Sequence, residues 1–188
     1  ALERLDFHDD EVFIGRSFIN IDFSNEILNN SDFSQCEFIN CKFDNTMLEN
    51  SNFSDAKFTD TNFISTYLAN SIFTNSTVNA TQFDKCTMPK SNFNQARISN
   101  TSFTNCNLEN SELNKTKISE CSFYITNLYS VSFIDSNIST TSFKLEKCDV
   151  FNSSERSVNF RLFSYIKFFG ANLLNCHFDY VVAHELKF

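Results

Sequence analysis

The sequence predicts an all-β fold, a four-sided parallel β-helix whose coils take about 20 residues each. Three observations support this class: a large apolar residue at every fifth position, a small residue two positions before most of them, and similarity between residues twenty apart. Neither a helix nor a strand has a period of five, whereas self-similarity at a fixed period is typical of repeat architectures. The 188 residues have the length of one domain.

The five-residue period runs without interruption from Phe13 to Phe143. Of the 27 positions numbered 5n+3, 16 are Phe, six are Leu, three are Ile, one is Val and one is Met. Because 41% of the chain is hydrophobic, an unbroken run has a chance probability on the order of 10⁻¹⁰. We therefore expect all of these side chains to point into the core.

A second selected position lies two residues before each large one. From 31 to 141 it is almost always Ser, Thr, Cys or Ala, with Val131 as the exception. Residues two apart share a face of an extended chain, so each unit directs one small and one large side chain inward. The other three positions are rich in Asn, Asp, Glu, Lys and Ser and are expected to face water.

Position n resembles position n+20, which indicates that four units close one coil. Stacked coils lie about 4.8 Å apart, so seven coils between 13 and 148 predict a rod of roughly 34 Å. Like residues would then form stacked Phe rings and Asn ladders. One column contains only Phe, namely Phe23, Phe43, Phe63, Phe83, Phe103, Phe123 and Phe143.

These units resemble those of the pentapeptide-repeat proteins, which read Ala, then Asp or Asn, then Leu or Phe, then two variable residues. Residues 171–175 (ANLLN) fit closely, and residues 56–60 (AKFTD) and 41–45 (CKFDN) fit more loosely. The resemblance covers roughly 11–148 and 171–180. It implies a right-handed quadrilateral parallel β-helix. Ser, Thr and Cys replace most of the family's small Ala residues.

The pattern degrades after Cys148. Arg156 and Arg161 would fall on small inward sites, and burying two unpaired guanidinium groups would cost several kcal/mol each. We expect an interruption at 149–170 that contains a short helix, with Ser154 and Gly170 as its caps. A distorted coil is the alternative.

The expected helix would close the open end of the solenoid or form a homodimer contact. Residues 1–12 are expected to cap the other end, and 171–188 to form a terminal partial coil. The residues predicted to make the cap or dimer contact are Val158, Leu162, Ile166 and Phe169.

The net charge of −8 is concentrated near the N-terminus, where residues 1–50 carry 11 acidic and three basic side chains. Binding phosphate needs a basic surface, so we expect no direct contact with nucleic acid. An acidic surface favours basic partners. The candidate partner contacts are Asp22, Asp32, Glu37, Asp44 and Glu49.

Neither the cysteines nor the histidines predict a catalytic, metal or cofactor site. Six of the seven cysteines fall on the small inward position, where Cys acts as a small hydrophobe. His8, His177 and His184 show no convergence with thiols or carboxylates. Gly15 and Gly170 are the only glycines, which excludes a Gly-rich phosphate loop. We expect a protein that is not an enzyme.

The chain has no apolar run of about 18 residues and no signal peptide pattern, so we expect a cytoplasmic, bacterial protein without a membrane span. The family resemblance implies a protein-binding role, as in members whose acidic rod imitates DNA at the DNA site of gyrase. That makes a type II topoisomerase a candidate partner. The alternative is a structural or targeting module of a larger bacterial protein or secreted effector.

Overall fold

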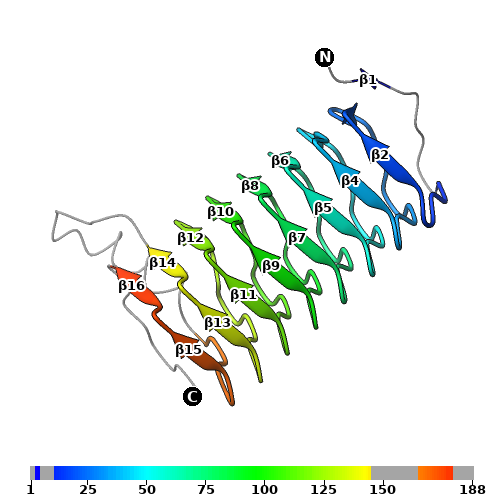
Figure 1. Cartoon of the computed structure of the whole chain (residues 1–188). Coiled ribbons are helices and arrows are strands. Elements are labelled where there is room, and N and C mark those ends of the chain that lie inside the picture. Colours follow the sequence, from blue (N-terminus) through cyan, green and yellow to red (C-terminus); the bar gives the residue numbers. More distant parts are fainter. Residues whose placement is uncertain (1–2, 5–10, 145–164, 180–188) are drawn as a thin grey trace, which may run out of the picture.

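The computed structural model describes residues 3–4, 11–144 and 165–179. Every regular element in these residues is a β-strand, and all the strand pairs are parallel. Successive coils follow one another along a single rod, from blue to red in Figure 1. The predicted all-β parallel solenoid is confirmed.

The chain turns a corner at every fifth residue through a left-handed backbone conformation. All 25 residues at positions 20, 25 and so on up to 140 have a positive φ, between 48° and 65°. Asn and Asp tolerate this region far better than most residues with a side chain, and Asn holds many of these positions. The corners therefore explain why a chain with so many turns has only two glycines.

Two faces of the rod are continuous sheets. We call them the eight-stranded face and the six-stranded face. The eight-stranded face consists of β2 (Ser17–Ile19), β4 (Glu37–Ile39), β5 (Lys57–Thr59), β7 (Thr77–Asn79), β9 (Arg97–Ser99), β11 (Lys117–Ser119), β13 (Asn137–Ser139) and β15 (Asn172–Leu174). The six-stranded face consists of β6 (Asn62–Ile64), β8 (Gln82–Asp84), β10 (Ser102–Thr104), β12 (Ser122–Tyr124), β14 (Ser142–Lys144) and β16 (His177–Asp179). At the N-terminal end, β1 (Glu3–Arg4) pairs with β3 (Ile21–Asp22).

The other two faces are joined by single parallel bridges between coils. We name them after one inward residue of each. The Phe33 face has the outward residues Val12, Asp32, Asn52, Ile72, Asn92, Glu112, Ser132 and Lys167. The Leu28 face has the outward residues Ile27, Met47, Tyr67, Thr87, Asn107 and Asn127.

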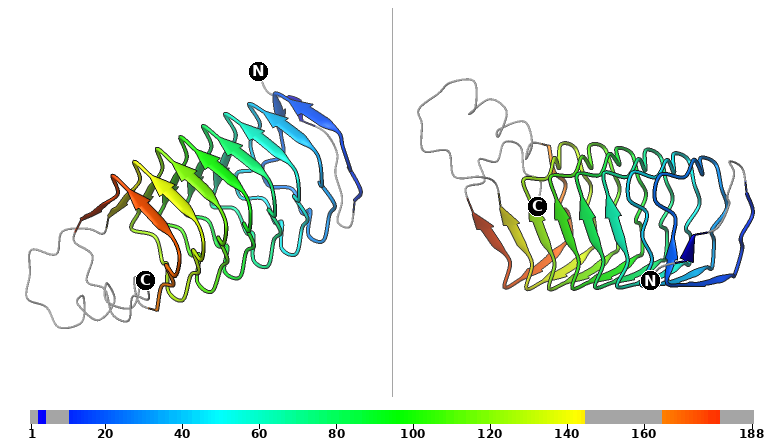
Figure 2. Two further views of the ribbon diagram at one scale, coloured as in Figure 1. Left: turned by 60° about the horizontal axis from the view of Figure 1, so that its bottom comes forward. Right: turned by 90° about the horizontal axis from the view of Figure 1, so that it is seen from above.

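The interior is a dry column of stacked side chains. All 27 predicted large positions are buried. Phe rings of successive coils stack with centroids 4.5–5.3 Å apart, and rings on opposite faces meet edge to face across the core, as Phe83 and Phe93 do at 6.5 Å and 86°. Figure 2 shows the resulting even spacing of the coils along the rod.

The small inward residues make hydrogen bonds that Ala could not make. Thr46 Oγ1 donates to the carbonyl of Phe23 at 2.7 Å, and Thr126 Oγ1 donates to that of Phe103 at 2.8 Å. The acceptor is the residue 23 positions earlier, which lies in the preceding coil. Buried hydroxyl groups are costly unless they are paired, so these bonds explain how Ser and Thr replace Ala here.

Residues 165–170 correct the prediction of a helix that continues to Phe169. They form part of a coil: Lys167 bridges to Ser132, and the ring of Phe168 stacks on Phe133 at 5.2 Å. Tyr165 has a φ of 59°, which no α-helix accommodates. The hydrophobic stripe in the sequence predicted a helix here. Phe168 keeps the five-residue period of the solenoid, however, and its burial in the core favours the coil.

After the interruption, the coil continues on top of the preceding one. Ile138 pairs with Leu173 and Phe143 with Phe178, so paired residues are 35 positions apart in the sequence and not 20. Fifteen extra residues are three whole units, so the register survives the interruption. Residues 145–164 lie outside the described part. They include Val158 and Leu162, so the prediction for those two residues is not tested.

Candidate protein-binding surface

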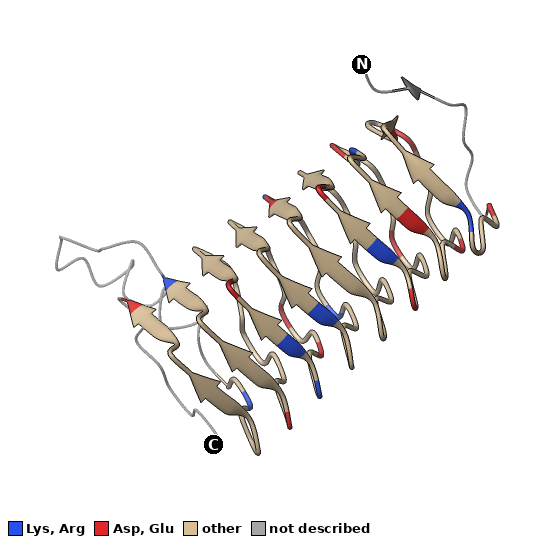
Figure 3. Cartoon of the chain, in the orientation of Figure 1, with Lys and Arg blue, Asp and Glu red and all other residues tan. Residues whose placement is uncertain are grey.

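Acidic side chains are concentrated in the first two coils of the rod (Figure 3). Residues 11–50 carry seven acidic and two basic side chains, whereas residues 51–144 carry seven of each. Charge therefore distinguishes one end of a rod whose shape hardly changes along its length.

The five predicted partner contacts are distributed around the rod and do not form one patch. Asp22 lies in line with the six-stranded face, Asp32 on the Phe33 face and Glu37 on the eight-stranded face. Asp44 and Glu49 lie at the two corners on either side of Met47, which belongs to the Leu28 face. A partner on one side of the rod can contact only those on one or two faces.

Two of these carboxylates also stabilise corners. Asp22 Oδ1 accepts a hydrogen bond from the backbone N–H of Ser24 at 3.0 Å, and Asp32 Oδ1 accepts one from that of Ser34 at 2.9 Å. Such contacts between an Asp side chain and the backbone two residues on are typical of turns. The Asp-x-Ser spacing is a sequence signal for this role that the charge argument overlooked.

Asp44 occupies an unfavourable position for a charge. Its Oδ1 atom is buried without a hydrogen-bond partner. Burial raises the pKa of this carboxyl and the charge of Asp22 adds to the effect, while Lys42 and the backbone N–H of Ile64 act in the opposite direction. The corner therefore holds a carboxylate that a nearby cation would stabilise.

An exposed hydrophobic stripe runs along the same end of the Leu28 face. We call Ile27, Met47 and Tyr67 the apolar column; they are joined by parallel bridges and are 53%, 37% and 46% exposed. The prediction that outward positions are polar fails here. The available signal was hydrophobicity repeated at twenty-residue spacing in an outward position.

A row of basic residues lies along the middle of the rod. Lys57, Arg97 and Lys117 begin β5, β9 and β11 on the eight-stranded face (Figure 3). All three are exposed, but Asp60 and Glu120 at the neighbouring corners offset much of their charge. This face is close to neutral.

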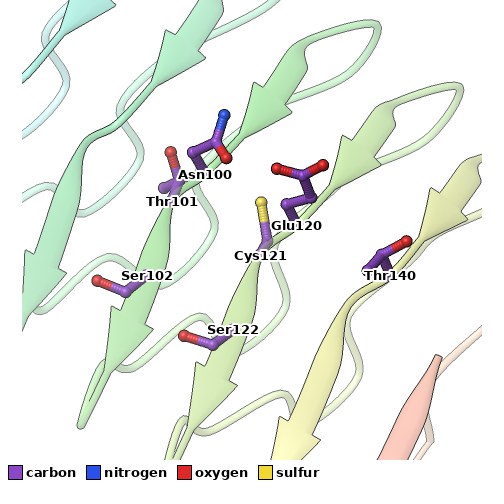
Figure 4. A pocket seen from close by; sticks show the side chains of 7 residues that line it. All are labelled: Asn100, Thr101, Ser102, Glu120, Cys121, Ser122 and Thr140. Carbon is purple, nitrogen blue, oxygen red and sulfur yellow. The ribbon is translucent and has the colours of Figure 1, made fainter. Parts of the chain in front are cut away.

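A shallow hollow of about 450 Å³ lies at the corner between the eight-stranded and six-stranded faces (Figure 4). Glu120 is its only carboxylate, and the exposed Asn100 and Thr140 flank it. Cys121 contributes a thiol whose pKa burial raises to about 11. A thiol that stays protonated is a poor nucleophile. The remaining lining residues are Thr101, Ser102 and Ser122.

The sequence comparisons now identify the family. The description "Pentapeptide repeats (8 copies)" matches residues 17–55 and 51–88, and "Pentapeptide repeat region" matches residues 76–154. The chain is a pentapeptide-repeat protein. No curated protein matches its sequence significantly.

The chain is similar to solved structures of other proteins at low sequence identity. Full-length QnrB1, a plasmid-mediated fluoroquinolone resistance protein, is 18% identical, with a TM-score of 0.52 over 95% of this chain and 93% of that one. Rfr23 from the cyanobacterium Cyanothece 51142 is 13% identical, with a TM-score of 0.45 over 70% of this chain and 88% of that one. At such identities the likeness to QnrB1 shows the fold alone.

The thiols of this pentapeptide-repeat protein are core residues, as the sequence predicted for six of them. Five are buried, Cys176 is partly buried, and all six are free. The pKa of Cys106 is well above its usual range because of its hydrogen bond with Cys86 and its burial. In the described ranges, no three His, Cys, Asp or Glu residues are placed to hold a metal ion, and a helical membrane span is likewise absent from them.

The two described residues of the predicted cap or dimer contact have different environments. Ile166 is fully buried at the inward position above Val131, whereas Phe169 is 65% exposed on the Phe33 face. His177 begins β16 and is exposed, while His8, His184 and Cys148 lie outside the described residues. Of Ile166 and Phe169, therefore, Phe169 is the residue exposed for a contact.

Proposed function

We propose that this pentapeptide-repeat protein is a non-enzymatic, cytoplasmic, protein-binding rod whose first two coils form the partner surface. The observation that carries the proposal is the concentration of acidic residues at 11–50 on an otherwise uniform scaffold. A stacked core holds those charges in fixed positions, and preorganised groups lose less entropy on binding.

We further propose a type II topoisomerase such as DNA gyrase as the partner, with the acidic coils taking the place of DNA. Duplex DNA carries one negative charge per about 1.7 Å of axis. Residues 51–144 have seven acidic and seven basic side chains, so the middle of the rod cannot imitate DNA by charge. The proposed mimicry is confined to the N-terminal coils. The fold shared with QnrB1 supports this choice of partner.

A gyrase supercoiling assay with and without a fluoroquinolone tests the choice of partner. We expect micromolar protein to change supercoiling or its inhibition by the drug. The double variant Glu37→Gln, Glu49→Gln should lose most of this effect, whereas Glu109→Gln, Glu120→Gln, which removes the same charge elsewhere, should keep it. No effect of the wild-type protein would exclude the topoisomerase.

A further inference from the structure

The fold does not require hydrophobic side chains at the positions of the apolar column, Ile27, Met47 and Tyr67. The same outward position continues along the Leu28 face as Thr87, Asn107 and Asn127 with the same parallel bridges. Polar residues therefore suit this position structurally. Three consecutive exposed hydrophobic side chains at one end of the column need another explanation, and contiguous exposed apolar surface is typical of interaction sites.

The surroundings of the apolar column are acidic. Glu49 lies two residues after Met47, at the corner that follows it, whereas Glu26 occupies the inward position equivalent to Thr46 and Thr66. Residues 26–30, 46–50 and 66–70, which form this part of the Leu28 face, contain no Lys or Arg. A molecule that covers the column must therefore bring apolar groups and positive charges together.

We propose that the apolar column binds an amphipathic helix of a partner protein, with its hydrophobic stripe on the column and Lys or Arg residues against Glu49. Helices that lay an apolar face on a hydrophobic surface are a common mode of recognition. The inference rests on the proposed protein-binding function and specifies the face and the chemistry of the partner.

The spacing of the coils fits a helix that lies along the rod. The core rings of the neighbouring column, Phe23, Phe43 and Phe63, stack at 4.5 and 4.8 Å, so Ile27 and Tyr67 are about 9 Å apart along the axis. Helix residues i, i+4 and i+7 rise by about 6 and 10.5 Å. An extended strand places successive residues of one face about 6.7 Å apart, which fits less well.

Charge disfavours the other occupants. A second copy that used the same face would bring Glu49 against its equivalent. Its basic residues Lys57, Arg97 and Lys117 are flanked by polar side chains such as Thr59 and Ser99, so they offer no hydrophobic surface to the column. Anionic lipid surfaces and nucleic acids would be repelled by the acidic flanks. A basic, amphipathic protein segment satisfies both features.

Fluorescence anisotropy with a synthetic helical peptide tests the proposal. The probe has about 18 residues, Leu at i, i+4, i+7 and i+11, and Lys or Arg beside this stripe. We expect binding with a Kd on the order of 10 µM. The double variant Met47→Asn, Tyr67→Thr should bind at least about tenfold more weakly, and Glu49→Gln about threefold more weakly with less dependence on salt.

The matched controls keep the outcome unambiguous. Ile72→Asn removes an exposed hydrophobic residue from the Phe33 face, between Asn52 and Asn92, and should leave the Kd unchanged. The column variants should unfold at the wild-type urea concentration. Equal affinity for a peptide with Glu in place of Lys and Arg, equal binding by the column variants, or no binding at about 1 mM would each overturn the proposal. A protein that fails this test yet alters gyrase activity would contradict the helix site alone.

Discussion

At the scale of single residues, the corner position determines which side chains the coil tolerates. Ile125 and Thr140 are β-branched residues held at φ values of 49° and 48°, where Asn stands in many other corners. The left-handed conformation costs an ordinary side chain roughly 1–2 kcal/mol. These two corners are therefore the clearest strain in the described rod.

Replacing Ile125 by Asn should increase the free energy of unfolding by about 1 kcal/mol, because Asn accepts the left-handed conformation. The new Asn side chain would lie one coil after Asn105 and could form a side-chain hydrogen bond with it. Asn40 and Asn20 form such a bond, in which Asn40 Nδ2 donates to Asn20 Oδ1 at 2.7 Å. Urea unfolding measures the effect. Asn105→Ile should lower stability by a similar amount, and a stabilising Asn105→Ile would refute this reading of the corners.

Two small inward serines should respond differently to truncation. Ser51 Oγ donates to the carbonyl of Leu28 at 2.8 Å, whereas Ser76 Oγ is buried without a partner. Ser51→Ala should cost about 1 kcal/mol, and Ser76→Ala should be neutral or stabilising by a few tenths. Equal losses in urea unfolding would show that the buried hydroxyls do not act through these bonds.

The thiol of Cys121 should make stability depend on pH in the alkaline range. Burial raises its pKa from 9.0 to about 11 in the folded protein. Below pH 9 both states keep the proton; above it the unfolded chain loses the proton first, so the free energy of unfolding falls between pH 9 and 11, by up to about 2 kcal/mol. Cys121→Ala should remove this part of the decline. An identical pH profile for both proteins would contradict the prediction.

At the scale of elements, the stability of each coil depends on its large inward side chains. Phe83 stacks between Phe63 and Phe103 at 4.8 Å on either side, while its neighbour Asp84 points outward. Phe83→Ala should cost about 3–5 kcal/mol through the cavity it leaves, and Asp84→Ala almost nothing. Thermal or urea unfolding of the two variants tests the register, which would be wrong if both lost the same stability.

The period of five and the similarity between residues twenty apart made the coil predictable, because every unit buries one small and one large side chain in the same way. The extension of the expected helix to Phe169 was wrong for a related reason: a short hydrophobic stripe can fit two periods at once, and the stacking of Phe168 on Phe133 shows that the five-residue period holds there. The role of Asn at the corners was not predicted, since φ is a backbone property that hydrophobic periodicity does not report. The hydrogen bonds of Thr46 and its equivalents likewise depend on contacts across coils.

At the scale of the whole molecule, shape and charge have different distributions. The core is nearly uniform along the rod, whereas acidic and exposed apolar residues are concentrated at the N-terminal end. The sequence predicted that charge asymmetry but not its arrangement, because residues such as Asp22, Asp32 and Glu37 fall on different faces. The apolar column could be recognised only when the structure placed Ile27, Met47 and Tyr67 on one face, in successive coils.

Direct binding to immobilised gyrase at two salt concentrations tests the central claim that the first two coils are the partner surface. The account predicts binding that weakens with added salt and is reduced about tenfold by Glu37→Gln, Glu49→Gln but unchanged by Glu109→Gln, Glu120→Gln. Equal losses from the two pairs, or no binding by the wild-type protein, would contradict it.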